Sequence, residues 1–172
     1  MTQVEAFPVQ SMRITCDVLI QATSQQVYSA LTTGVALWWG VGHLESRKLA
    51  RDLVLEPRLG GRFYESWEDP STDKDGALLG HVIQIRKWQL IKIAGYFGQE
   101  ERCAHGVLSI WLRKEEGATR VVLQHDAVGD IDDELRQSFA KNWEELLEAL
   151  RAQVERHEAG GLRRDPAMDA GH

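Results

Sequence analysis

The chain has 172 residues, of which 43% are hydrophobic and 27% are charged, and its formal net charge at pH 7 is −6. This length and composition fit one globular domain with a sizeable core. The negative charge argues against the basic surface with which proteins bind nucleic acid or anionic lipid.

Cysteine use and the lack of targeting patterns predict a cytoplasmic protein. Cys16 and Cys103 are the two cysteines, and they lie far apart without a CxxC pair, so we expect no disulfide framework. Residues 1–13 lack the basic start and apolar stretch of a signal peptide. No apolar run approaches the length of a membrane span, so we expect no membrane insertion.

The first part of the chain predicts one strand and two short helices. Residues 1–11 are expected to form a flexible N-terminus, and residues 11–21 alternate apolar and polar side chains as a strand does. Thr23 is followed three residues later by Gln26, which is the spacing of a capping box at the start of a helix. The two short helices are expected over residues 23–31 and 35–39.

Most of the chain from residue 53 to residue 128 predicts strands joined in hairpins. The paired glycines Gly60 and Gly61 permit the backbone angles of a tight turn. The polar stretch 68–76 contains the Pro and Gly of a hairpin loop. The expected strands cover residues 53–55, 63–67, 79–86, 89–97, 107–115 and 119–126.

The last long segment, residues 131–156, has the three-to-four spacing of a helix with one buried stripe. The apolar residues of that stripe are Ile131, Leu135, Phe139, Trp143, Leu146, Leu147, Leu150 and Val154. Asp130 is expected to cap this helix, and Gly160-Gly161 to stop it. Residues 158–172 are expected to be a disordered tail.

This order of elements predicts an α+β protein with one domain over residues 12–157. A curved antiparallel sheet of about six to seven strands would wrap around the long C-terminal helix, with two short helices after the first strand. One helix cannot fill the concavity of such a sheet along its whole length. We therefore expect a gap between the sheet and the helices, where a ligand can bind.

Several short segments follow one another in a recognisable order. They are Ala22-Thr23, Val27-Tyr28, Ala30-Leu31, Trp38-Trp39, Glu56 to Phe63, Gly80-His81-Val82, Gly117 to Val121 with His125, and Trp143 with Leu146, Leu147 and Leu150. In this order the chain resembles, over residues 12–156, the SRPBCC superfamily of START lipid-transfer domains, the birch-pollen-allergen fold and polyketide cyclases. More specifically, it resembles the branch related to the activator of the heat-shock chaperone ATPase.

The resemblance implies a helix-grip fold and a role as a carrier or regulator. The chain departs from the usual pattern in the middle of the sheet, where relatives often have a proline-rich turn between two strands. Here the turn reads Arg86-Lys87-Trp88-Gln89.

Large aromatic side chains are candidate walls of the expected cavity, because they bury apolar ligands well and Trp adds one N–H donor. For Phe139 and Trp143 the alternative is plain packing of the long helix. Trp38 and Trp39 are adjacent on a short helix, so we expect one of them to point inward and the other to guard the access to the cavity.

Three polar side chains could face the same cavity. Glu65 has the strand parity of Phe63, and a carboxyl group there could act as acid, base or hydrogen-bond anchor. His81 and His125 each share a strand face with apolar neighbours. The alternatives are a rim Glu65 paired with Arg62 and histidines satisfied by the backbone at a sheet edge.

The candidate ligand-binding residues are therefore Trp38, Trp39, Phe63, Glu65, Trp67, His81, Phe97, His125, Phe139 and Trp143. No catalytic residue is assigned. The six histidines show no HxH or HExxH spacing, and the chain has neither a GxSxG motif nor a P-loop, so we expect no metal and no cofactor.

Three functions remain open from the sequence, and the first is favoured. It is the binding, without catalysis, of a hydrophobic small molecule or lipid-like compound in the internal cavity. The second, a chaperone-associated regulator, rests on the resemblance alone. The third is a cyclase, dehydratase or hydrolase that uses Glu65 with His81 or His125. A homodimer could form through an exposed edge strand, either the first strand or the 53–55 strand.

Overall fold

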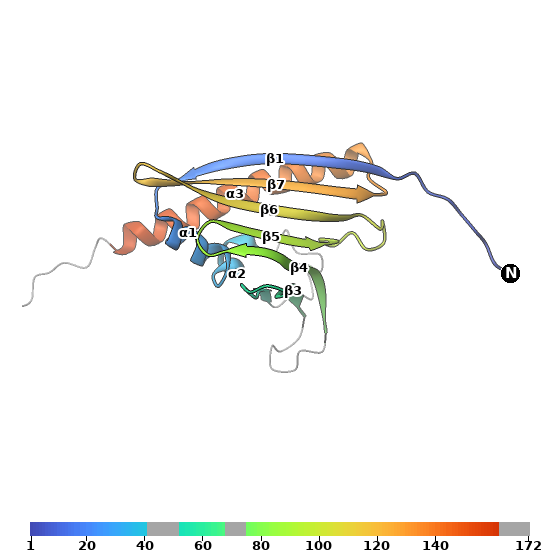
Figure 1. The fold of residues 1–172 in the computed structure, drawn as a ribbon, viewed down its shortest axis with the longest axis horizontal. Coiled ribbons are helices and arrows are strands. Elements are labelled where there is room, and N and C mark those ends of the chain that lie inside the picture. Colours follow the sequence, from blue (N-terminus) through green and yellow to red (C-terminus); the bar gives the residue numbers. More distant parts are fainter. Residues whose placement is uncertain (41–51, 68–74, 162–172) are drawn as a thin grey trace, which may run out of the picture.

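The computed structural model describes residues 1–40, 52–67 and 75–161. These residues form a strand, two short helices, six further strands and a long helix (Figure 1). The elements are β1 (Gln10–Ile20), α1 (Ser24–Leu31), α2 (Val35–Trp39), β2 (Asp52–Leu55), β3 (Arg62–Ser66), β4 (Gly76–Arg86), β5 (Leu90–Gly95), β6 (His105–Glu115), β7 (Ala118–Gly129) and α3 (Asp133–Gly161). The predicted α+β order is confirmed. The loop expected at 68–76 and the link between α2 and β2 lie mostly outside the described residues.

The seven strands form one antiparallel sheet in the order β1-β7-β6-β5-β4-β3-β2. The two edges are therefore β1 and β2, the strands that the sequence proposed as edges. α3 runs along one face of the curved sheet, and α1 and α2 lie on the same side (Figure 1). Residues 1–9 are exposed, have no regular structure and extend away from the sheet before the start of β1 (Figure 1).

The inner face of the sheet is built from rows of side chains in register across neighbouring strands. One row joins Ile14 of β1, His125 of β7, Leu108 of β6 and Ile93 of β5. Leu108 and Ile93 are almost fully buried, and so is His125. The row thus places one imidazole in the middle of an otherwise aliphatic surface.

Strand β4 does not follow the simple alternation that the sequence predicts for it. That alternation put Leu79, His81 and Ile83 on one face, but Leu79 and Val82 are buried while His81 and Ile83 are exposed. The pairing of β3 with β4 shifts next to Phe63, and that of β4 with β5 shifts after Val82. An extra residue at each irregularity turns the following side chains to the other face. The prediction of an inward His81 is therefore wrong.

Both predicted helix starts are capped, but at the second the capping residue differs from the predicted one. Thr23 and Gln26 form the predicted capping box at the start of α1. At the start of α3 the cap is Asp132, not Asp130, because its carboxylate accepts the backbone N–H of Leu135 at 2.8 Å. Asp132 also forms an ion pair with Arg102.

The buried stripe of α3 covers the inner face of the sheet as predicted. Trp143, Leu146, Leu147, Leu150 and Val154 are all less than a tenth exposed. The helix continues to Gly161 and so includes the first four residues of the expected tail 158–172. The rest of that tail lies outside the described residues.

Truncating the centre of this stripe should therefore destabilise the whole fold. Leu150 is 0% exposed, so Leu150→Ala is expected to lower the free energy of unfolding by about 2–5 kcal/mol. Urea unfolding followed by circular dichroism measures this. Glu148→Ala, on the exposed side of the same helix, should change the free energy by less than about 0.5 kcal/mol. Equal effects of the two substitutions would contradict the packing described above.

Candidate functional site

The space between the sheet and α3 is filled by aromatic rings that come from α2, β3 and α3 itself. Trp39 of α2 lies with its ring centre 5.2 Å from Phe63 of β3 and 5.7 Å from Trp143 of α3, both edge to face. Phe139, one turn before Trp143 on α3, stacks on it at 6.4 Å. These contacts link the two halves of the sheet through the helices, so the aromatic cluster is the structural centre of the interior.

The neighbouring indoles of α2 are both buried, which corrects the expectation that only one would point inward. Trp38 is 7% exposed and Trp39 is 8% exposed. They leave the helix in different directions: Trp38 packs toward α1, where its Nε1 donates to the backbone oxygen of Ala30 at 2.8 Å, and Trp39 packs toward Phe63. α1 covers the side of α2 that the sequence alone leaves open.

His125 is enclosed by three aromatic rings. Its ring centre lies 5.0 Å from Phe97, 4.9 Å from Phe139 and 5.6 Å from Trp143, all edge to face. The side chain fits because the adjacent inward position on β6 is Gly106. A Cβ at that glycine would lie 3.0 Å from His125 Nε2 and 2.3 Å from the backbone oxygen of Asp126.

A hydrogen bond fixes the tautomer of His125. Trp143 Nε1, which can only donate, gives its proton to His125 Nδ1 over 3.2 Å. In the neutral ring the remaining proton is therefore on Nε2. Burial lowers the pKa of His125 from the usual 6.5 to about 4, against a small opposing effect of Asp126. The imidazole is thus neutral at physiological pH.

Two buried nitrogen atoms of this region, Trp39 Nε1 and His125 Nε2, have no hydrogen-bond partner among the described residues. Both are donors in the state just described. Buried donors without an acceptor are rare in native proteins and unfavourable by about 1–3 kcal/mol each. The interior therefore holds two N–H groups for which the described part of the chain supplies no acceptor.

A small cavity of about 50 Å³ opens in the aromatic cluster. It is lined by Trp39, Leu79, Phe97, Phe139, Asn142, Trp143 and Leu146. Phe97, Phe139 and Asn142 are only half-buried, so they form the side of the cavity nearest to solvent. The volume is enough for a few atoms, and a larger molecule requires the two phenylalanine rings to turn outward.

The remaining predicted site residues do not gather at this cavity. Glu65 is 0% exposed and accepts a hydrogen bond from Trp67 Nε1 at 3.2 Å, while His81 is exposed on the other face of the sheet. Glu65 lies on β3 and His125 on β7, with three strands between them. The distance between these two strands across the sheet is about 19 Å. Glu65 is thus brought together with neither histidine.

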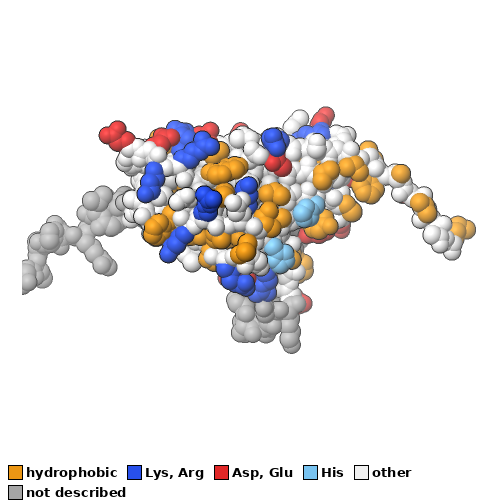
Figure 2. Space-filling model, viewed as in Figure 1, with side chains coloured by type: hydrophobic (Ala, Val, Ile, Leu, Met, Phe, Trp, Pro, Cys, Tyr) orange, Lys and Arg blue, Asp and Glu red, His pale blue; other side chains and the backbone are white. Residues whose placement is uncertain are grey.

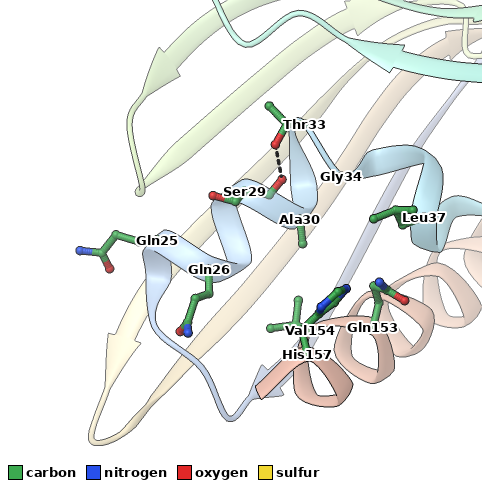
Figure 3. Close-up of a pocket in the computed structure, with 10 residues that line it drawn as sticks. All are labelled: Gln25, Gln26, Ser29, Ala30, Thr33, Gly34, Leu37, Gln153, Val154 and His157. Carbon is green, nitrogen blue, oxygen red and sulfur yellow. Dashed lines mark hydrogen bonds between the residues drawn. The ribbon is translucent and has the colours of Figure 1, made fainter. Parts of the chain in front are cut away.

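A second, wider hollow of about 500 Å³ lies between α1, α2 and the last turns of α3 (Figure 3). It is lined by Gln25, Gln26, Ser29, Ala30, Thr33, Gly34, Leu37, Gln153, Val154 and His157. In Figure 3 the side chains of Ala30, Leu37 and Val154 mark its apolar part, and Thr33 donates to the backbone oxygen of Ser29. This hollow was not predicted from the sequence, although Leu37 is an apolar residue on the face of α2 opposite the buried indole of Trp39.

Among the described residues no group of three His, Cys, Asp or Glu side chains is placed to hold a metal ion. Within that same part of the chain, no helix is long and apolar enough to cross a membrane.

A curved antiparallel sheet that holds one long C-terminal helix over an aromatic interior defines the helix-grip class of proteins. Residues 21–155 match the family described as Activator of Hsp90 ATPase homolog 1-like protein. The chain therefore belongs to this family, within the SRPBCC superfamily, as the sequence predicted.

Solved structures agree with this assignment at the level of the fold. An uncharacterised protein from Rhizobium leguminosarum is 19% identical, with a TM-score of 0.66 over 87% of this chain and 97% of that one. The Aha1 dimer from Colwellia psychrerythraea is 17% identical, with a TM-score of 0.62 over 84% and 96%. Protein NE0264 from Nitrosomonas europaea is 13% identical, with a TM-score of 0.61 over 86% and 96%. No protein with a curated description is significantly similar in sequence.

The buried imidazole should make stability depend on pH. In the unfolded chain His125 binds a proton below its usual pKa of about 6.5, whereas in the folded protein it does so only below about 4. Stability from this group is therefore present above pH 6.5 and lost as the pH falls to 4, by about 3 kcal/mol. Urea unfolding at pH 7 and pH 4.5 measures the loss.

The matched variant for that measurement is His125→Gln, which keeps a polar side chain but cannot titrate. It should be less stable at pH 7 and should show a smaller drop between the two pH values than the wild type. The same drop in both proteins would mean that His125 is not the group responsible.

Proposed function

We propose that the protein binds, without catalysis, a small and mainly apolar molecule that carries a hydrogen-bond acceptor. The site is the aromatic interior between the sheet and α3. The observation that carries the proposal is a pair of buried donors without an acceptor among the described residues: Trp39 Nε1 in the cavity wall, and His125 Nε2 behind the aromatic rings of that wall. A ligand oxygen would satisfy at least one of them and so remove an unfavourable feature of the free protein.

The lining favours a neutral ligand over a charged one. Aromatic and aliphatic side chains make up the cavity wall apart from Asn142, and burying an unpaired charge among them is costly. His125 is neutral at physiological pH because its pKa is lowered to about 4. It therefore offers an N–H donor rather than a counter-ion, which suits a carbonyl or ether oxygen.

The small size of the cavity suggests that binding and opening are coupled. Phe97 and Phe139 are half-buried and contact the His125 ring. We expect a ligand with more than a few heavy atoms to displace the Phe97 and Phe139 rings from their contact with the imidazole. Of the predicted residues, Trp39, Phe97, His125, Phe139 and Trp143 belong to this proposal. Trp38 and Phe63 support the wall, and Glu65, Trp67 and His81 are left outside it.

The first test is native mass spectrometry of freshly purified protein, in which we expect a co-purified small molecule. The second is an NMR titration with two probes of the same shape, cyclohexanone and methylenecyclohexane. The ketone should bind more tightly because it supplies the missing acceptor. Trp39→Phe keeps an aromatic ring but removes the donor, so it should weaken ketone binding by about five-fold and leave the hydrocarbon unchanged.

Filling the cavity provides the matched control. Leu79 lines the cavity, whereas the neighbouring Leu78 is 45% exposed on the other face of the sheet. Leu79→Phe should abolish binding of both probes, and Leu78→Phe should have no effect. Absence of a co-purified molecule together with no binding of either probe, or equal effects of the two leucine substitutions, would refute the proposal.

A second candidate function, regulation of a chaperone ATPase, is favoured by the family match over residues 21–155. Its test is the ATPase rate of a purified Hsp90-type chaperone with and without this protein, with heat-denatured protein as control. An increase in rate that requires the folded protein would support this role. An unchanged rate and no co-migration on a sizing column would count against it.

A further inference from the structure

The outer face of the sheet carries a cluster of positive charge that contrasts with the net charge of −6. The cluster surrounds the β4–β5 turn and the end of β6. We call it the basic outer patch, and it consists of Arg86, Lys87, Trp88, Lys92, Trp111, Arg113 and Lys114. Figure 2 shows Lys and Arg side chains gathered among hydrophobic ones on this face, with Asp and Glu mainly toward its margins.

The five cations of the patch lack carboxylate partners within the described residues. The other Lys and Arg side chains of the described segments form ion pairs, except Arg156; these are Arg13, Arg58, Arg62, Arg102, Arg120, Arg136, Lys141 and Arg151. Asp17 and Glu115, the acidic groups nearest to the patch on β1 and β6, are both held by Arg120. Within the described segments, most cations elsewhere are thus paired with carboxylates, whereas those of the patch are not.

The patch surrounds a groove of about 510 Å³ between the β4–β5 turn and β6. Its floor includes Leu90 and Trp111, which are paired across β5 and β6 and share the outer face. Arg86 lies on one side of the groove, and Arg113 and Lys114 lie on the other. Cationic walls on both sides of an apolar floor suit a ligand that has negative charges along an apolar or aromatic body.

The turn itself is held in an unusual conformation. Trp88 has a φ of +66° and is 40% exposed. A bulky residue at positive φ is strained, and the strain is not offset by burial of the indole. Lys87 lies over the Trp88 ring at 5.0 Å and Lys92 over the Trp111 ring at 5.9 Å. Each indole of the groove therefore has a lysine over one of its faces.

We propose that the basic outer patch is a docking site for a short acidic peptide segment of a partner protein, bound in extended form. Carboxylates of the segment would pair with Arg86 on one side and with Arg113 and Lys114 on the other. An apolar side chain between them would lie on Leu90 and Trp111. This site is separate from the aromatic interior and does not depend on ligand binding there.

Two other polyanions fit the patch less well. Single-stranded nucleic acid binds by stacking bases on aromatic faces, but here lysine side chains already cover one face of each indole. An anionic membrane surface is flat on the scale of this site, whereas these residues line a concave groove. The overall charge of −6 also opposes long polyanions more than a short segment.

Fluorescence anisotropy with a labelled octapeptide that alternates Glu with Phe or Leu tests the proposal. We expect binding that weakens as NaCl rises from about 50 to about 500 mM, because exposed charge pairs are screened. The Lys-for-Glu peptide should not bind, and the Ser-for-apolar peptide should bind less tightly. Arg86→Glu combined with Arg113→Glu should weaken binding at least about ten-fold, and Trp88→Ala by several-fold.

The control has the same change in net charge at another place. Lys141→Glu combined with Arg151→Glu alters exposed ion-paired residues of α3 and should leave the peptide affinity unchanged. Circular dichroism confirms that each variant is folded. No binding of the acidic peptide, or equal losses in the two double variants, overturns the proposal. So does binding that is confined to an oligo-dT strand or to phosphatidylserine vesicles.

Discussion

The constraint on which the structure depends is the mismatch between a wide sheet and a single helix. Seven strands at about 4.8 Å spacing span about 29 Å, whereas one helix with its side chains is about 10–12 Å across. α3 therefore cannot cover the inner face alone. The protein closes the difference by curving the sheet, by adding α1 and α2 on the same side, and by placing large aromatic rings in the space that remains.

This way of filling the interior has a chemical consequence. Indole and imidazole rings bring N–H groups into a region where few acceptors are within reach. Trp38 reaches the backbone of α1 and Trp143 reaches His125, but Trp39 Nε1 and His125 Nε2 find no partner among the described residues. The same rings that hold α3 on the sheet thus create a binding surface with unsatisfied donors. The packing of the interior and the proposed ligand binding therefore have the same cause, a sheet that is wider than the helix it holds.

The charged side chains of the outer surface are arranged independently of the aromatic interior. Ion pairs such as Arg13–Asp126 and Arg62–Glu56 join neighbouring strands or turns at the surface. At the β4–β5 turn the cations are not paired within the described residues, and a strained Trp88 stands between them. Such an arrangement contributes little to folding, because like charges near one another repel. These cations are instead available to an external partner of opposite charge.

Much of the fold could be predicted from the sequence because its signals are periodic. The stripe from Ile131 to Val154 has a helical period that no strand could use, and the Thr23-Gln26 spacing marks a helix start directly. The irregularities in strand pairing could not be predicted from the sequence. The irregularity in the pairing of β4 with β3, which precedes His81, turned that side chain outward, and no residue type in the sequence marks its position.

The site was predicted in part for a similar reason. His125 lies on β7, which pairs in register with both neighbours, so its strand parity holds across the sheet. Trp38 and Trp39 required knowledge of where α1 packs, which depends on tertiary contacts. The hydrogen bond from Trp143 to His125 joins residues 18 apart in sequence on different elements and has no local signature.

The most direct test of ligand binding in the aromatic interior is the ¹H–¹⁵N NMR spectrum of the six indole N–H groups as cyclohexanone is added. We expect the Trp39 Nε1–H signal to move downfield as it gains an acceptor, and the Trp143 signal, already bonded to His125, to change much less. A Trp39 signal that does not move, or a response confined to the exposed Trp88, would contradict it.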